Sequence, residues 1–528
     1  MKLHELFPEI SLNPSSAKDI KQWILQLAVE GKLTNKWRKE NGSINYQNVL
    51  INESEFKIPD NWKIKKIKEI GKTQTGGTPS KSIPEFFGNY IPFIKPGDIN
   101  NWSVNYTNEG LSENGKLKLG RYAPKNSILM VCLGTIGKCA LIEKDCCFNQ
   151  QINSLTALDQ NAQYLLIAMS SNYFQQYAWS KSTSTTIALL NKSNWENIFL
   201  PLPPLEEQQA IVTIVENLFK EVDELAKQAT QRIELKRSYA QAALKRLCEA
   251  DTKAEWQQLV SVFPEIFNDK QTIKTLRETI LQLAVQGKLT AKWRSSRASL
   301  PHAQELLDQI KAEKDQLVKE KKIKAEKPLP PIEADKVPFE LPEGWVWTYL
   351  GESMLKITDG THHSPINEPN GKFKYVTAKN IKDNGIKLSG ITYVTDEVHK
   401  EIFSRCNPEF GDLLYIKDGA TTGICCINNL TEEFSMLSSV ALIKQPKVIK
   451  GDYLLTVFRS SFFYDLMRSG MTGVAITRVT LSKLKESMIP LPPLEEQIII
   501  VEKVNALMRL CDELEREVDK KILLIKEI

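Results

Sequence analysis

Apolar side chains recur at alternating spacings of four and three residues through 205–247 and again after residue 494. The first series comprises Ile211, Val215, Leu218, Val222, Leu225 and Ala229, then Ala240, Ala243 and Leu247; the second comprises Ile500, Val504, Leu507, Cys511, Leu514 and Val518. Sustained heptads predict long helices with a coiled-coil seam. A helix over 205–247 would span about 60 Å at 1.5 Å per residue. The simplest packing pairs the two helices, antiparallel, as a rigid spacer; pairing with a helix of another protein is the alternative.

Short strand patterns separated by Gly, Pro, Asn and Asp fill residues 53–200 and 336–489. Helical patterns follow the strands at 162–179 and 451–470. This order, strands first, predicts two α+β units. The stretch 305–335 is rich in Lys and Glu and then in proline, which predicts a helix followed by an extended polyproline II connector. Its charges are of mixed sign, which favours a solvated face over nucleic-acid binding.

A long internal repeat relates the two halves. ILQLAVEGKLTNKWR at 24–38 returns as ILQLAVQGKLTAKWR at 280–294, and PLPPLEEQ at 201–208 returns at 490–497. Between these blocks the match is weaker but keeps its order. Two long units indicate a duplication rather than a solenoid of many short repeats. We infer two different specificities in the divergent parts and one shared partner for the repeated parts; uneven drift of two copies is the alternative.

The order of the blocks predicts a circular arrangement cut inside one repeat. The first PLPPLEEQ helix leads into the second ILQLAV block, whereas the chain stops after the second PLPPLEEQ helix. The missing ILQLAV block stands near the N-terminus, so the two ends together should rebuild the element that the middle carries whole. We therefore expect pseudo-twofold symmetry with neighbouring termini. The predicted segments are 1–52 (completing the distal helical region), 53–200, 201–335, 336–489 and 490–528.

Candidate partner-binding residues flank the helix ends. Gly31 and Gly287 are placed to end the two ILQLAV helices. Trp and Arg are frequent hot-spot residues at interfaces, so the Trp-Arg pairs that follow are candidates, although each Trp could equally cover its own helix end. The candidates, with the first residues of the long helices, are Trp37, Arg38, Trp293, Arg294, Leu205 and Leu494.

Composition places the protein among ordinary globular chains. Its 528 residues predict three to four domains, and 42% hydrophobic with 25% charged residues exclude a disordered or collagen-like chain. The net charge of +5 permits a nucleic-acid partner without demanding one. No apolar run approaches a membrane span, and Glu5, Pro8 and Glu9 stand where a signal peptide needs an apolar core, so we expect a cytoplasmic protein. Nine cysteines without a C-x-x-C motif predict reduced, mostly buried thiols and no zinc site.

Polar loops at matching positions of the two units carry the candidate chemistry. Lys and Arg neutralise phosphate or read guanine, Asn reads adenine, and Thr and Ser donate to phosphates, so loops of these residues with Gly suit DNA. His362 and His363 are adjacent but lack a third ligand, so we expect no metal there. The candidate DNA contacts are Thr75, Thr78, Ser80, Lys81, Lys95, Lys138, Ser184 and Thr185 in the first unit, and Thr361, His362, His363, Lys379, Asn380, Lys417, Thr421, Thr422 and Arg478 in the second.

Catalytic motifs are missing from the sequence. It contains no N-P-P-Y-type motif and no glycine-rich cofactor loop, G-x-S-x-G or H-E-x-x-H. The GTIGK loop at 134–138 is too short for a phosphate-binding loop, and Cys139 stands where Ser or Thr is needed. These absences favour a binding protein over an enzyme.

Taken together, the motifs resemble the specificity subunits of type I restriction–modification enzymes. The resemblance rests on PLPPLEEQ and ILQLAV-x-GKLT, each present twice, on LPPIEADKVPFELPEGW, and on TGGTPS, KPGDI and GDLLYIKDGATTG, and it covers essentially the whole chain. It implies a pseudo-twofold, circular α+β protein: two target-recognition domains separated by two long antiparallel coiled-coil helices. In that family each recognition domain reads one half of a bipartite site in double-stranded DNA.

The resemblance also implies partners and cofactors. Two modification (M) subunits would dock on the helical regions, bind S-adenosylmethionine and methylate adenine, and restriction (R) subunits would use ATP and Mg. No cofactor, metal or catalytic residue is then expected in this chain, and no membrane partner. The helices would act as a ruler, so that four residues inserted near 250 would lengthen the spacer between half-sites. The alternatives are a coiled-coil scaffold tethering two ligand-binding modules without DNA, and a DNA methyltransferase in its own right.

Overall fold

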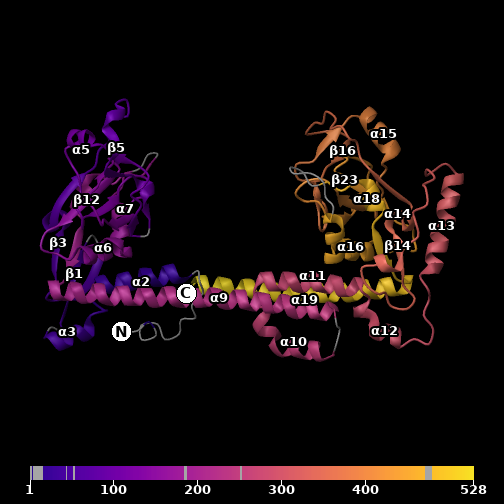
Figure 1. The fold of residues 1–528 in the computed structure, drawn as a ribbon, viewed down its shortest axis with the longest axis horizontal. Coiled ribbons are helices and arrows are strands. Elements are labelled where there is room, and N and C mark those ends of the chain that lie inside the picture. Colours follow the sequence, from indigo (N-terminus) through magenta and orange to yellow (C-terminus); the bar gives the residue numbers. More distant parts are fainter. Residues whose placement is uncertain are drawn as a thin grey trace. The chain divides into compact units, whose positions relative to one another are not determined.

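The computed structural model describes Leu3 and residues 16–42, 45–51, 54–100, 102–183, 187–249, 253–469 and 478–527. The chain forms two compact units, Met1–Ile233 and Glu234–Ile528, and each combines strands and helices (Figure 1). The predicted α+β class is confirmed. Within the described residues, no helix is both long enough and apolar enough to cross a membrane.

The two predicted long helices are present. Helix α9 (Leu205–Glu249) and helix α19 (Leu494–Glu527) each begin two residues after a short strand, β13 (Phe199–Leu202) or β24 (Met488–Leu491). Prolines fill both gaps, where a missing N–H costs nothing. The seam positions are buried or half-buried along both helices, from Ile211 to Ala229 and from Ile500 to Val518. The heptad pattern therefore predicted the buried faces correctly.

Inside each unit the seam packs on the helix that carries ILQLAV. In unit 1, helix α2 (Ala17–Val29) runs antiparallel to α9, with Lys21 paired to Asp223 at 2.6 Å. In unit 2, helix α11 (Lys270–Val285) runs antiparallel to α19, with Arg277 paired to Asp512 at 2.6 Å. Periodicity specifies a buried face but not its partner, so the sequence left the other long helix and a helix of another protein as the candidates. The described part of the predicted 1–52 segment makes its contacts within unit 1.

The strand-rich body of unit 1, the part predicted over 53–200, contains two small sheets. A four-stranded sheet has the order β10-β9-β12-β4, and a three-stranded sheet has the order β11-β5-β8, in which β11 and β5 are parallel. Strand β13 pairs with β3 beside them. The elements are β1 (Tyr46–Ile51), β2 (Ser54–Pro59), β3 (Lys63–Lys66), α4 (Ile67–Ile70), β4 (Gly71–Thr75), β5 (Phe87–Ile94), β6 (Ile99–Asn100), β7 (Ser103–Val104), β8 (Gly110–Leu111), α5 (Glu113–Leu119), β9 (Ile128–Val131), β10 (Cys139–Leu141), β11 (Cys147–Phe148), β12 (Ile152–Ala157), α6 (Ala162–Ser170), α7 (Asn172–Ser180) and α8 (Lys192–Glu196).

Unit 2 repeats this plan. Its four-stranded sheet has the order β15-β23-β20-β21, its second sheet has the order β19-β16-β22, and β16 and β22 are parallel. The elements are β14 (Val346–Tyr349), α14 (Leu350–Ser353), β15 (Lys356–Asp359), β16 (Phe373–Val376), β17 (Ile381–Lys382), β18 (Gly385–Ile386), β19 (Thr392–Val394), α15 (Asp396–Arg405), β20 (Leu413–Ile416), β21 (Cys425–Ile427), β22 (Phe434–Met436), β23 (Val440–Lys444), α16 (Gly451–Arg459), α17 (Ser461–Arg468) and α18 (Leu481–Lys485).

Four further helices lie outside the strand-rich parts of the two units. Helix α3 (Asn35–Asn41) and helix α12 (Ala291–Ser295) follow the two ILQLAV helices, and helix α10 (Lys253–Ile266) packs on the end of α9. Helix α13 (Gln304–Lys319) carries the Lys/Glu-rich run and ends before the proline cluster, as predicted. All nine cysteines are free; eight are buried and Cys248 is half-buried, which confirms the prediction of mostly buried thiols.

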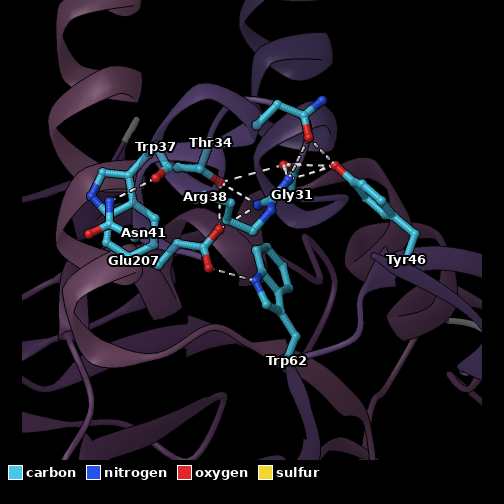
Figure 2. A network of polar contacts seen from close by, with 9 residues as sticks. Gly31, Thr34, Trp37, Arg38, Asn41, Tyr46, Trp62 and Glu207 are labelled. Atoms are coloured by element: carbon cyan, nitrogen blue, oxygen red, sulfur yellow. Dashed lines mark hydrogen bonds and ion pairs between the residues drawn. The ribbon is translucent and has the colours of Figure 1, made fainter. Parts of the chain in front are cut away.

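One buried ion pair ties the N-terminal segment of unit 1 to its long helix (Figure 2). Helix α2 ends at Val29, and Gly31, two residues later, has a φ of 71°, which is readily adopted only by glycine. The chain then turns so that Arg38, only 2% exposed, donates to Glu207 Oε1 at 2.5 Å. Thr34 donates to the same oxygen at 2.7 Å, and the Trp62 indole donates to Glu207 Oε2 at 2.9 Å. We call this set the latch of unit 1.

The same latch recurs in unit 2. Glu496 Oε1 accepts hydrogen bonds from Arg294 and Thr290, and Trp345 donates to its Oε2 at 2.8 Å. Gly287, with a φ of 69°, replaces Gly31, and its carbonyl accepts from Arg294 Nη2 at 2.7 Å. The repeated blocks GKLT-x-KWR and PLPPLEEQ are therefore the two sides of one contact, built once in each unit.

Replacing Glu207 by Gln should unfold unit 1 more easily, because it leaves the Arg38 guanidinium buried without a countercharge. Breaking a buried ion pair in this way costs about 3–5 kcal/mol. Urea denaturation followed by tryptophan fluorescence measures the loss, and Glu496→Gln should produce the matching loss in unit 2. The control is Glu206→Gln at the exposed neighbouring position. Equal effects of Glu206→Gln and Glu207→Gln would contradict the latch.

Candidate nucleic-acid interface

The polar loops of unit 2 meet at one edge of its four-stranded sheet. Strands β15 and β20 end at this edge, and β21 and β23 begin there, because neighbouring strands in the order are antiparallel. Strand β16 of the second sheet ends beside them, since Leu437 N donates to Val376 O at 3.0 Å. The loop edge of unit 2 thus comprises residues 359–363, 377–380, 417–424 and 437–439, with Arg478.

Unit 1 has an equivalent loop edge, formed by residues 75–78, 95, 132–138 and 149–151. Strands β4 and β9 end there and β10 and β12 begin there. Asn149 N donates to Ile94 O at 3.0 Å, which brings the end of β5 to the same place. The structure therefore brings together, in each unit, loops that lie far apart in the sequence.

A glycine is required at one point of each edge. Gly76 follows β4 and Gly360 follows β15, and both are buried. A Cβ atom at Gly76 would collide with the backbone carbonyl of Asn149, and one at Gly360 would collide with that of Met436. These close approaches fix where the loops leave the sheet.

Most candidates of unit 1 lie at or beside this edge. Thr78 and Lys138 are exposed there, and Ser80 and Lys81 are exposed in the loop that continues from it. Thr75 is half-buried and donates to Asn153 Oδ1 at 2.8 Å. Lys95 forms an ion pair with Glu109. Ser184 and Thr185 lie outside the described residues.

The exposed candidates of unit 2 lie on its loop edge. They are His362, His363, Lys379, Thr421 and Arg478. Thr361 is half-buried and donates to the carbonyl of His363 at 3.0 Å, which shapes the loop that carries both histidines. His362 Nε2 lies 3.6 Å from Asp359 Oδ1.

Three predicted contacts of unit 2 are corrected by their burial. The ammonium group of Lys417 is 2% exposed and lies 3.4 Å from Asp359 and 3.2 Å from Asp418. Asn380 is buried, and its side chain accepts from Thr377 N and donates to Lys387 O. Thr422 is buried and donates to Gly419 O at 2.7 Å. These side chains hold the loops in shape rather than facing a ligand.

The candidate partner-binding residues divide in the same way. Arg38 and Arg294 are corrected, because both guanidinium groups are occupied in the latches. Trp37 and Trp293 are half-buried, and the guanidinium of Arg297 lies 4.2 Å from the Trp293 ring centre. Leu205 is 53% exposed and Leu494 is half-buried.

Sequence reasoning missed an arginine that supports each edge. Arg121, just after α5, donates to Thr75 O at 2.9 Å, and Arg405, at the end of the equivalent α15, donates to the carbonyls of Asp359 and Gly360. Each arginine thus holds the last residue of the strand that precedes the required glycine. It also missed Gln150, an exposed residue whose Oε1 accepts from Thr78 at 2.6 Å. The position of each arginine at the end of a helix was the available signal.

Two cysteine thiols lie at or near the edges, and neither is activated as a nucleophile. Burial raises the pKa of Cys132, at the end of β9, to about 12, and burial raises the pKa of Cys406, after α15, to about 12 as well. Both thiols therefore stay protonated at neutral pH, and a thiol is a far weaker nucleophile than a thiolate. What the edges offer is hydrogen-bond donors, acceptors and positive charge.

Comparison with known proteins gives one consistent result. The family model for the type I restriction modification DNA specificity domain matches residues 59–235 and 342–524. The specificity subunit of the type I restriction enzyme EcoEI from Escherichia coli is 25% identical, covering 94% of this chain and 90% of the relative. The corresponding EcoAI subunit from Escherichia coli is 28% identical over 67% of this chain and 61% of the relative.

A solved structure is similar over most of its length. The crystal structure of the HsdS subunit from Thermoanaerobacter tengcongensis has 17% identity and a TM-score of 0.42, covering 89% of this chain and 94% of that chain. The family model covers the strand-rich body of each unit and most of the long helix that follows it, in line with the repeat. The chain belongs to the family of type I restriction–modification specificity subunits.

Proposed function

We propose that the strand-rich body of each unit reads one half of a bipartite site in double-stranded DNA, through its loop edge. The observation that carries the proposal is the matched pair of edges: two units with one backbone plan and different exposed side chains. Unit 1 offers Thr78, Gln150 and Lys138, and unit 2 offers His362, Lys379 and Arg478. Such side chains hydrogen-bond to base edges and phosphates.

The long helices set the distance between the half-sites and dock two M subunits. In support, the blocks that repeat most closely, GKLT-x-KWR and PLPPLEEQ, lie on the helical side of each unit, where a partner used twice would bind. The exposed Leu205 and half-exposed Trp37 are available there. M subunits would bring S-adenosylmethionine, and R subunits would bring ATP and Mg. The chain itself is the non-catalytic recognition subunit of a cytoplasmic complex.

Co-expression of the chain with its M subunit should methylate adenines in a split motif with two defined halves and an unspecified spacer. Genome-wide mapping of methylated adenine in the expression host measures this. A host expressing the M subunit alone serves as the control and should show no such motif. A continuous motif, or none, would contradict the proposal and favour a scaffold without DNA.

Replacing Lys379 by Ala should weaken binding of the complex to its site and lower the salt dependence of the affinity by about one counterion. Lys379 is exposed, whereas the ammonium of Lys95 is paired with Glu109, so Lys95→Ala should have the smaller effect. Gel shifts at several salt concentrations measure both. Unchanged affinity and slope for Lys379→Ala would show that this lysine does not contact DNA.

Lengthening α9 should change only the spacer. Residue 250, near which the sequence analysis placed the insertion, is outside the described residues. We therefore place four extra residues within α9, between Lys227 and Gln228, where both side chains are exposed. Four residues add about 6 Å of helix. The methylated motif should keep both halves and gain one or two spacer base pairs. Four residues added in the connector at 325–330 are the control, and an unchanged spacer for the helix insertion would refute the ruler.

A further inference from the structure

A half-buried carboxylate and two buried charges lie behind Arg478 on the loop edge of unit 2. Arg478 is 55% exposed, and its Nε lies 3.3 Å from Asp418 Oδ1. Asp418 Oδ2 accepts from the buried ammonium of Lys417 at 3.2 Å. Lys417 in turn lies 3.4 Å from Asp359, which is 3% exposed. The carboxylate that faces Arg478 is therefore itself held in place from behind.

The backbone at Arg478 is fixed as well. Arg478 bridges Asp418 in antiparallel fashion, and Val479 N donates to Lys417 O at 2.8 Å. Val479 is buried, and helix α18 begins two residues later. The backbone from which the side chain starts is thus anchored, and Nε lies within ion-pair distance of Asp418.

Unit 1 has the same backbone arrangement with other side chains. Leu189 bridges Leu133 in antiparallel fashion, Leu190 N donates to Cys132 O at 2.8 Å, and α8 begins two residues later. Leu189, 42% exposed, takes the place of Arg478. Leu133 and Cys132 take the places of Asp418 and Lys417. The same backbone arrangement therefore carries charged side chains in unit 2 and apolar side chains in unit 1. Such a difference is expected of a position that sets specificity.

We propose that Arg478 reads a guanine in the major groove, with Asp418 as its positioning residue. A planar guanidinium can donate two parallel hydrogen bonds to guanine O6 and N7, provided its plane is held at the right angle. Contact with phosphate needs positive charge but no such fixed plane, and Asp418 and Asp359 reduce the local charge. Burying Asp359 and Lys417 behind the half-buried Asp418 costs desolvation, and a fixed position for the carboxylate that faces Arg478 is what they supply.

The inference rests on the proposed function, and one experiment separates the two. The chain and its M subunit are co-expressed with Arg478→Ala, and methylated adenines are mapped in the host genome. One guanine position in one half-site should become degenerate, with a loss of about tenfold or more in preference for guanine, while the other half-site stays intact. Arg478→Lys should restore little, because an ammonium cannot make the bidentate contact.

Two further variants complete the design. Asp418→Asn keeps the side-chain volume and should partly relax the same guanine position. The shift that it causes in the melting temperature of unit 2 should be no larger than the shift caused by the Arg478 variants. Lys372→Ala removes one positive charge at the opposite end of β16, where Lys372 is 70% exposed, and should leave the motif unchanged.

The outcomes are distinguishable. If the unmodified chain gives no split motif, the proposed function fails. If it gives a split motif that Arg478→Ala leaves unchanged, only the inference fails. It also fails if Arg478→Ala weakens all sites equally and lowers the salt slope, which is the result expected of a phosphate contact, or if the relaxed position is not a guanine.

Discussion

The structure depends on one buried carboxylate in each unit. Glu207 and Glu496 each accept hydrogen bonds from a threonine, an arginine and a tryptophan. The threonine and arginine follow the ILQLAV helix, the tryptophan enters the strand-rich body, and the glutamate opens the long helix. A single residue thus joins the three parts. Because the group is ionised and enclosed, every donor must be present for it to be stable.

This constraint explains the uneven repeat. Blocks that build the latch cannot change one residue at a time, since each change leaves a buried charge or donor unsatisfied. Exposed side chains on the loop edges bear no such restriction, because the loops are held by backbone hydrogen bonds, by inward-facing side chains such as Lys417 and by the required glycine. At equivalent positions the first unit has Leu189 and the second has Arg478, on the same backbone arrangement. Within each unit, the residues that stabilise the fold are therefore different from the exposed residues of the loop edge that would contact DNA.

Much of this arrangement was predictable. Heptads gave the buried faces of α9 and α19, and Gly31 and Gly287 marked the helix ends, because these signals are local. The partner of each seam was not predictable, since α2 and α11 are distant in sequence and periodicity does not name a partner. The loops were correctly selected as exposed groups at matching places, but Lys417, Asn380 and Thr422 face inward. Residue type gives the chemistry of a side chain, whereas its direction depends on sheet edges that meet only in the fold.

Gly76 and Gly360 lie where a strand presses against a neighbouring backbone carbonyl, in the middle of surfaces otherwise built from exchangeable side chains. No side chain of any size fits there, so a protein that acquires a new preference must do so around this point. Each edge therefore has one backbone position, at its glycine, that cannot accept a side chain. Substitutions among such proteins should come first in the long, solvent-facing side chains of the edge. They should come last in the strand that ends at this glycine.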